Sequence, residues 1–176
     1  MSKLIESEKQ FWNSDQVVKL FSEKNPSGYL KQYIAEKDIE GLTTLDHGCG
    51  GGRNARLLAE KGAELYVVDV NPAMISQTLE ILKDYYGEET PDRVEESHIV
   101  DLPFRDNEFN LVVSMGVLHQ AHDLTDLETS IDEISRVIEK KGNLVLEIFT
   151  NEVLPSDFEI KKEYEGAVAV RTAENL

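Results

Sequence analysis

The chain has 176 residues, of which 40% are hydrophobic and 30% are charged, a composition typical of one globular domain. Its 34 acidic residues outnumber its 18 basic residues, which gives a formal net charge of −16 and disfavours nucleic acid as a partner. The charged N-terminus and the lack of a long apolar stretch exclude a signal peptide and a membrane span, and so predict a cytoplasmic protein. The single cysteine, Cys49, excludes an internal disulfide and a multi-cysteine zinc site.

Residues 1–41 have a mostly helical pattern that is interrupted between Asn25 and Gly28. We expect this segment to cover one edge or the mouth of the following domain. Two of its aromatic residues, Phe11 and Trp12, are expected to pack in the core, with a role as a lid over a bound cation as the alternative.

From residue 42 onward, short β-branched runs alternate with amphipathic stretches, which indicates βα units on a parallel sheet. Helices are expected from the glycine-rich turn to Gly62, from Asn71-Pro72 to Gly87, and from the capping-box residues Thr125 and Glu128 to Lys140-Lys141-Gly142. The third crossover, 102–109, is too short for a helix and is expected to be a taut loop. The expected strands are 42–46, 64–69, 97–100, 110–114 and 143–149.

The most informative segment is the glycine-rich turn Asp46-x-Gly48-x-Gly50-x-Gly52, which lies between the first expected strand and a helix. Glycines in such a turn let a ligand approach the backbone, and the helix N-terminus beyond it offers free N–H donors. Asp69 ends the second expected strand, where a carboxylate can accept the hydroxyl hydrogens of a ribose. Asp101 ends the third. All of these positions fall at the carboxyl edge of the sheet, where open α/β sheets bind ligands.

Two ligand classes compete for this turn. Gly50-x-Gly52-x-x-Ala55 with Asp69 formally satisfies the dinucleotide fingerprint, so a nicotinamide-dependent oxidoreductase is one interpretation. The glycines begin two residues earlier, however, at Gly48, and the strand follows about 40 residues of helical pattern. Both features favour a different class of cofactor-binding domain.

The order of the motifs resembles the class I S-adenosylmethionine-dependent methyltransferases, in particular their small-molecule branch. Residues 45–52 resemble the first motif of that family, and 66–74 resemble the second. The third and fourth are similar to 101–104 and 109–119, and 134–146 resemble the helix and strand that follow. The resemblance implies a Rossmann-like, doubly wound and mainly parallel α/β sheet in the strand order 3-2-1-4-5. It also implies S-adenosylmethionine as the cofactor and a small-molecule methyl acceptor.

By the same resemblance, the backbone at Gly48, Cys49 and Gly50 is expected to hold the methionine part of the cofactor. Asp69 is expected to bind the ribose. The adenine is expected to pack on Val70 and to be read by the Asp101 carboxylate and the Leu102 amide. The backbone near Ser114 and Met115 is expected to face the amino group.

The sequence departs from the family in three places. His47 stands where a small or apolar residue is common, and Asn110 replaces the aspartate usual at the start of the fourth strand. The third departure is length: family members add a helix and an antiparallel strand pair after the fifth strand, which 151–176 cannot supply in full. We therefore expect one domain with a helical cover at 1–41, a cofactor-binding core at 42–150 and a shortened extension at 151–176, in which 167–170 is the expected strand. A homodimer through the exposed sheet edge is a hypothesis that follows.

No motif fixes a catalytic residue. His119 follows the fourth expected strand and is the candidate general base, although alignment of the reactants alone can suffice for transfer from a sulfonium. His119, His122 and Asp123 have a spacing that could bind a metal, but without a further ligand we predict no metal site. His98 is expected to pack on the third strand. The functional hypotheses are thus a methyltransferase, a cofactor-binding module without catalysis, and the oxidoreductase named above.

Overall fold

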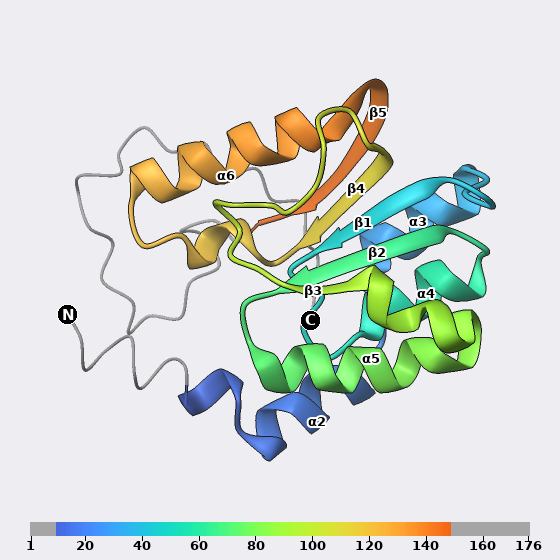
Figure 1. The fold of residues 1–176 in the computed structure, drawn as a ribbon, viewed down its shortest axis with the longest axis vertical. Helices are drawn as coiled ribbons and strands as arrows, with labels where there is room; N and C mark the ends of the chain where they lie inside the picture. The colour runs from blue at the N-terminus through green and yellow to red at the C-terminus, as the bar shows by residue number, and fades with distance from the viewer. Residues whose placement is uncertain (1–9, 149–176) are drawn as a thin grey trace.

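A computed structural model describes residues 10–148 of the chain. Its strands form one sheet in the order β3-β2-β1-β4-β5, and each neighbouring pair is parallel. This arrangement confirms the predicted Rossmann-like, doubly wound fold and its strand order (Figure 1). The strands are β1 (Thr43–His47), β2 (Glu64–Asp69), β3 (Val94–Glu96), β4 (Phe109–Met115) and β5 (Ile138–Glu147).

Helices cover both faces of the sheet. Buried side chains of α3, α4 and α5 pack with Leu65, Val67 and Leu111 on one face, and α6 packs over Leu45 and Val112 on the other. Figure 1 shows α6 on the opposite side of the sheet from α4 and α5. The helices are α2 (Asp15–Glu23), α3 (Gly28–Glu36), α4 (Arg53–Glu60), α5 (Pro72–Tyr86) and α6 (Leu124–Val137), with 3-10 turns η1 (Gly87–Arg93) and η2 (Leu118–Gln120).

The second βα unit has the bounds that the sequence predicts. β2 covers Glu64–Asp69, and α5 begins with Pro72 in its first turn and ends before Gly87. Proline fits the first turn because its missing N–H would have no partner there, and Gly87 has a φ of 55°, which favours glycine.

The third strand corrects the sequence prediction. β3 is Val94–Glu96 and not 97–100, because its parallel pairing with β2 ends where the Ser97 amide donates to the Asp69 carbonyl at 3.0 Å. In this edge strand only Val94 is buried, so it lacks the apolar pattern by which strands are recognised. His98 and Asp101 therefore lie in the third crossover and not on a strand.

The last βα unit also differs from the prediction. α6 begins at Leu124, and its N-cap is Asp123 and not Thr125. The Asp123 side chain accepts a hydrogen bond from the Asp126 amide at 2.9 Å. The helix ends at Val137, because Ile138 already pairs with Phe109 as the start of β5. Lys140-Lys141-Gly142 consequently belong to the strand and not to a helix end, next to a register shift. The expected residue 149 of this strand lies outside the described residues.

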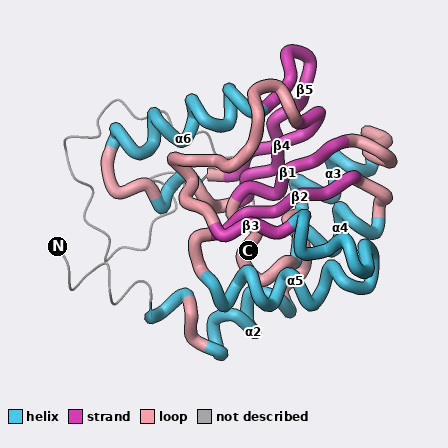
Figure 2. Tube along the Cα trace, in the orientation of Figure 1, coloured by secondary structure: helices cyan, strands magenta, loops and turns pink. Residues whose placement is uncertain are grey.

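The third crossover is a loop, as predicted. Residues 97–108 contain no helix and run from β3 past α6 to β4 (Figure 2). Among residues 10–148, no helix is long and apolar enough to cross a membrane. The expected strand at 167–170 lies outside the described residues.

The N-terminal cover packs closely on the glycine-rich turn. Trp12 packs with Val17, Val18 and Met74, which confirms its expected place in a core, whereas Phe11 is 55% exposed. A Cβ atom on Gly51 would lie 2.7 Å from the Ser22 backbone nitrogen. Glycine is therefore required at this position, and α2 is brought directly beside the predicted cofactor site.

Candidate functional site

The glycine-rich turn follows β1 and is fixed by its neighbours. The amides of Gly48 and Cys49 both donate to the Val68 carbonyl at 2.9 Å, so neither is available to a ligand in this arrangement. Thr78 of α5 donates its hydroxyl to the Gly50 carbonyl at 2.8 Å. A Cβ atom on Gly50 would meet no atom of the described residues within 4 Å, so Gly50 borders open space.

Cys49 is a buried residue of this turn. Its thiol lies 3.7 Å from the Thr78 hydroxyl, and burial raises its pKa well above the ordinary value, with the nearby Asp69 carboxylate as a second cause. The thiol therefore stays protonated, and Cys49 fills a tight space beside α5.

Asp69 joins the end of β2 to the glycine-rich turn. Its Oδ2 accepts the Gly50 amide at 2.9 Å, and its Oδ1 accepts both the backbone and the side-chain N–H groups of Asn71 at 2.9 Å. A carboxylate oxygen accepts more than one hydrogen bond, so Oδ2 keeps capacity for a hydroxyl donor. The structure thus brings Asp69 and Gly50 together, as the sequence predicts for a ribose site.

Two residues that the sequence prediction omitted complete this corner. Asp46 is buried, and neither carboxylate oxygen has a hydrogen-bond partner within residues 10–148. Burial raises its pKa to about 7; Asp69 adds to this rise, whereas Arg53 opposes it. Asn13 accepts the Ala73 amide at 3.0 Å and so caps α5 in place of Asn71. Asp46 stands first in the glycine motif, which was a usable signal, but no local pattern marks Asn13.

His47 points to the opposite face of the sheet from Asp46. Its Nδ1 lies 3.0 Å from the Ser114 hydroxyl of β4, and burial lowers its pKa to about 4, partly opposed by the Ile99 backbone. The imidazole is therefore neutral at pH 7 and links β1 to β4. Met115, the next residue of β4, packs its side chain in the core with α4 and α5, so only its backbone can serve the predicted role.

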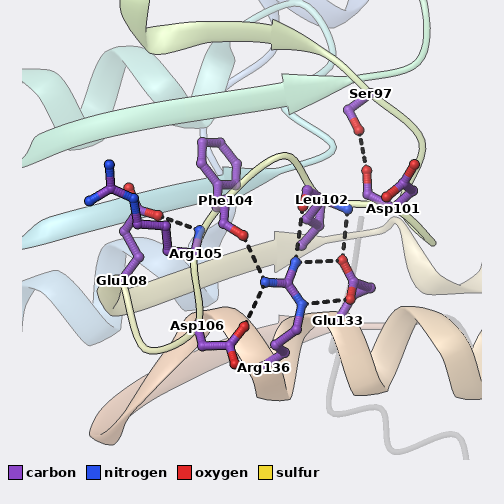
Figure 3. A network of polar contacts seen from close by, with 9 residues as sticks. All are labelled: Ser97, Asp101, Leu102, Phe104, Arg105, Asp106, Glu108, Glu133 and Arg136. Atoms are coloured by element: carbon purple, nitrogen blue, oxygen red, sulfur yellow. Dashed lines mark hydrogen bonds and ion pairs between the residues drawn. The ribbon is translucent and has the colours of Figure 1, made fainter.

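The predicted adenine-facing residues differ in availability. Val70 is 43% exposed and Asp101 is also exposed, so both side chains can contact a ligand. Leu102 is buried, and its amide donates to Glu133 Oε2 of α6 at 2.8 Å (Figure 3). The Leu102 amide, expected to read adenine, therefore bonds a protein carboxylate in this structure.

The candidate base lies at the same carboxyl edge, after β4. His119 is in η2 and is half-buried; burial lowers its pKa, and the Glu147 carboxylate opposes this shift. Glu147, at the end of β5, accepts the Ser27 hydroxyl at 2.7 Å, so the N-terminal cover reaches this corner too. Nothing in the sequence pattern links Ser27 to Glu147. Residues 10–148 contain no group of three or more metal-ligating side chains, and this range includes His122 and Asp123.

The sheet order, the glycine-rich turn and the acid at the end of β2 define a Rossmann-like cofactor-binding domain. Residues 45–146, more than half of the chain, match the model of the family described as "Methyltransferase domain". The chain therefore belongs to this methyltransferase family. The match confirms the predicted resemblance to methyltransferases.

Similar proteins include MJ0638 of Methanocaldococcus jannaschii, a protein described as uncharacterized. It is 30% identical over 125 residues, which are 71% of this chain and 47% of that protein, so the chain spans about half the length of this relative. A proposed S-adenosyl-L-methionine-dependent methyltransferase from Methanococcus maripaludis superposes with a TM-score of 0.59 at 21% identity, over 75% of this chain and 62% of that one. A SAM-dependent methyltransferase from Aquifex aeolicus superposes with a TM-score of 0.51 at 20% identity, over 76% and 66% of the two chains. Identities this low show the fold alone.

The residues present fit S-adenosylmethionine. Asp46, a buried carboxylate to which no group of residues 10–148 donates a hydrogen bond, suits a ligand that carries a positive charge. Open space at Gly50 and the exposed side chains of Val70 and Asp101 leave room along the same edge. The edge offers the carboxylates of Asp46, Asp69 and Asp101, which match a cationic cofactor with a neutral sugar better than a phosphate-bearing one.

Proposed function

We propose that this chain binds S-adenosylmethionine along the carboxyl edge of its sheet and transfers the methyl group to a small-molecule acceptor. The observation that carries the proposal is the corner formed by Asp46, Gly50 and Asp69. There a buried carboxylate that has no hydrogen-bond partner in the described part of the chain lies beside a glycine-rich turn, and a second carboxylate fixes this turn in place. This combination favours a ligand with both a cationic and a hydroxyl-bearing part.

S-adenosylmethionine supplies a methyl group that is already activated by a sulfonium. The work of the chain is therefore to bind, align and exclude water, and a dedicated catalytic residue is not required for a soft nucleophile. In this proposal Asp69 accepts ribose hydroxyls, Val70 packs on the adenine and Asp101 accepts from its amine. Asp46 provides the negative charge near the methionine part. The backbone of Gly48, Cys49 and Gly50 borders this part through its carbonyl groups, because its three amides already bond Val68 and Asp69, and the backbone of Ser114 and Met115 faces the amino group.

For an amine or hydroxyl acceptor, we assign the role of general base to His119. Burial lowers the pKa of this imidazole, so it is neutral at pH 7 and able to accept a proton from the acceptor. The acceptor's lone pair forms the new bond to the methyl carbon while the carbon–sulfur bond breaks. Glu147 faces the same corner, and its charge favours the protonated imidazole that results.

The test is calorimetric titration of the purified chain with S-adenosylmethionine, S-adenosylhomocysteine and NADH. We expect micromolar binding of both adenosyl ligands and none of NADH. Tight binding of NADH alone would instead favour the oxidoreductase. Binding without turnover over a broad acceptor panel would favour a module without catalysis.

Asp69→Ala is expected to abolish adenosyl binding, because it removes the proposed ribose contacts and the hydrogen bond to Gly50. Asp69 also organises the turn, so the folded state of the variant is checked by circular dichroism. Asp84→Ala, which removes an exposed acid on α5, is the matched control and is expected to bind as the wild type does.

We further propose that two copies of the chain pair through β5, which is one of the two edge strands of the described sheet. Leu144 and Leu146 of this strand are 45% and 42% exposed although they are apolar. An antiparallel pairing centred on Leu144 would set Lys141 of each copy opposite Glu147 of the other. This charge complementarity supports a second copy as the occupant of the edge.

A further inference from the structure

The N-terminal cover contacts several loops at the carboxyl edge of the sheet, although it precedes all of them in the chain. Asn13 Oδ1 accepts a backbone amide in the first turn of α5 at 3.0 Å. The backbone of Ser22 in α2 lies so close to Gly51 that a side chain on Gly51 would collide with it. After α2, the Ser27 amide donates to Asn54 Oδ1 in the first turn of α4 at 3.0 Å. The cover therefore borders the proposed cofactor corner from α5 to α4.

Asn13 also reaches the proposed ribose carboxylate through one intermediate residue. Its Nδ2 donates to Asn71 Oδ1 at 3.4 Å, and Asn71 donates through both its backbone N–H and its Nδ2 to Asp69 Oδ1, at 2.9 Å each. Because Asn13 bonds the oxygen of the Asn71 amide, the nitrogen of that amide faces Asp69 and holds the carboxylate in one orientation. The orientation of Asp69 thus depends on a residue of the N-terminal cover.

α2 is docked by a small apolar cluster of its own. Val17 and Val18 pack with Met74 of α5, and Trp12 and Phe21 pack against this cluster, which is separate from the two cores on the faces of the sheet. The helix has nine residues, and no side chain within residues 10–148 caps its N-terminus. A helix this short is not stable alone in water, so α2 depends on these contacts. It can therefore open locally while the two cores stay intact.

Building on the proposed cofactor site, we propose that residues 13–27 act as a strap whose docking and cofactor binding strengthen each other. The docked strap packs on Gly51 and orients Asp69 through Asn71, so it gives the corner the geometry that binds the ribose. A cofactor that fixes this corner stabilises the docked strap by the same factor, because coupling between two equilibria is reciprocal. Asn13 is a positioning residue, since it acts through Asn71 and does not touch the ligand.

Hydrogen exchange measured by mass spectrometry on the full chain, with and without saturating S-adenosylhomocysteine, tests this coupling. We expect the ligand to slow exchange of the α2 amides, residues 15–23, by about fivefold or more, which is the lower end of typical coupling between sites. The amides of η1, residues 87–93, are the internal reference, because η1 precedes β3 at the opposite edge of the sheet. Their exchange should change by less than about twofold.

Two substitutions of Asn13 separate the orientation of Asp69 from the capping of α5. Asn13→Ala removes both contacts and should weaken binding of S-adenosylhomocysteine about three- to tenfold, as expected for loss of a hydrogen bond. Asn13→Asp keeps the oxygen that caps α5 but has no N–H group for Asn71. Its affinity should therefore fall about threefold or more, while its stability stays close to that of the wild type.

Thr90→Ala is the control for a loss of stability alone. It removes a buried hydroxyl that donates to the Gly87 carbonyl at 2.7 Å in η1, far along the chain from the strap. We expect this variant to unfold more easily in urea and to bind S-adenosylhomocysteine with the affinity of the wild type.

An α2 helix whose exchange slows no more than that of η1 on binding would overturn the inference, since docking and binding would then be independent. Wild-type affinity in a folded Asn13→Asp chain would overturn it as well. Failure of every chain, the wild type included, to bind S-adenosylhomocysteine is a different result, because it overturns the proposed function itself. Circular dichroism melts establish that each variant is folded.

Discussion

Asp46 and His47 are neighbours on β1 that bury titratable groups on opposite faces of the sheet. The fold favours the neutral form of both: burial raises the pKa of Asp46 to about 7 and lowers that of His47 to about 4. Burying a charge without a partner is unfavourable, so Asp46, whose oxygens have no hydrogen-bond partner within residues 10–148, lowers the stability of the protein while it serves the site. Their opposite shifts predict opposite dependences of stability on pH.

Asp46→Asn is expected to stabilise the ligand-free protein at alkaline pH. The native pKa lies above the unfolded value near 4, so the wild type loses stability as the pH rises towards and through 7. At pH 8 the variant should be more stable by about 1 to 3 kcal/mol, and the pH-dependent part of this difference should vanish below pH 4. Urea unfolding across this range measures it, and S-adenosylmethionine should bind the variant more weakly. A difference that does not change with pH would contradict the prediction.

His47→Gln tests the opposite sign. Because the native pKa of His47 lies below the unfolded value, the unfolded chain takes up the proton first and the wild type loses stability as the pH falls from 6.5 to 4. Relative to the variant, the wild type should lose up to about 2 kcal/mol between pH 7 and pH 5. Parallel unfolding curves for the two proteins at both pH values would show that His47 does not titrate in this way.

At the scale of elements, the sequence was informative where an element carries its own boundary signals. Pro72 and Gly87 delimit α5, and the glycine motif with Asp69 locates the cofactor corner. β3 was misplaced because a short edge strand with two exposed glutamates has no apolar period. The end of α6 was misplaced because pairing of Ile138 with β4 overrides the local signals at Lys140-Lys141-Gly142. Contacts between distant segments set these boundaries, and no local pattern encodes them.

The cap of α5 is such a distant contact. Asn71 directs its side chain to Asp69, so Asn13 accepts the Ala73 amide instead. Asn13→Ala should therefore lower the stability by about 1 kcal/mol, the usual effect of losing an N-cap. Asn13→Asp keeps the accepting oxygen at a helix N-terminus and should be close to the wild type. Thermal and urea unfolding measure both variants, and equal losses in the two would indicate that the cap is not the cause.

At the scale of the whole molecule, the sheet is covered unevenly. Helices pack on both of its faces. On the face that α6 covers, Val112 of β4 is buried, whereas the neighbouring side chains of Leu144 and Leu146 on β5 are exposed. The edge strand therefore offers both unpaired backbone groups and apolar side chains within the described structure, a combination that natural sheets usually protect. The overall charge of −16 opposes association of two copies, so pairing depends on the local match between Lys141 and Glu147.

Sedimentation velocity of the full chain tests the proposed pairing. We expect a dimer at micromolar concentration that dissociates in Leu144→Glu, because two buried glutamates would meet at the centre of the pairing. Lys141→Glu should weaken the dimer about tenfold or more, since it sets like charges opposite one another. Lys61→Glu is the control, at an exposed lysine remote from β5. It changes the net charge equally and should leave the dimer intact. A monomer at all concentrations, or equal effects of the two charge reversals, would rule out this edge as the interface.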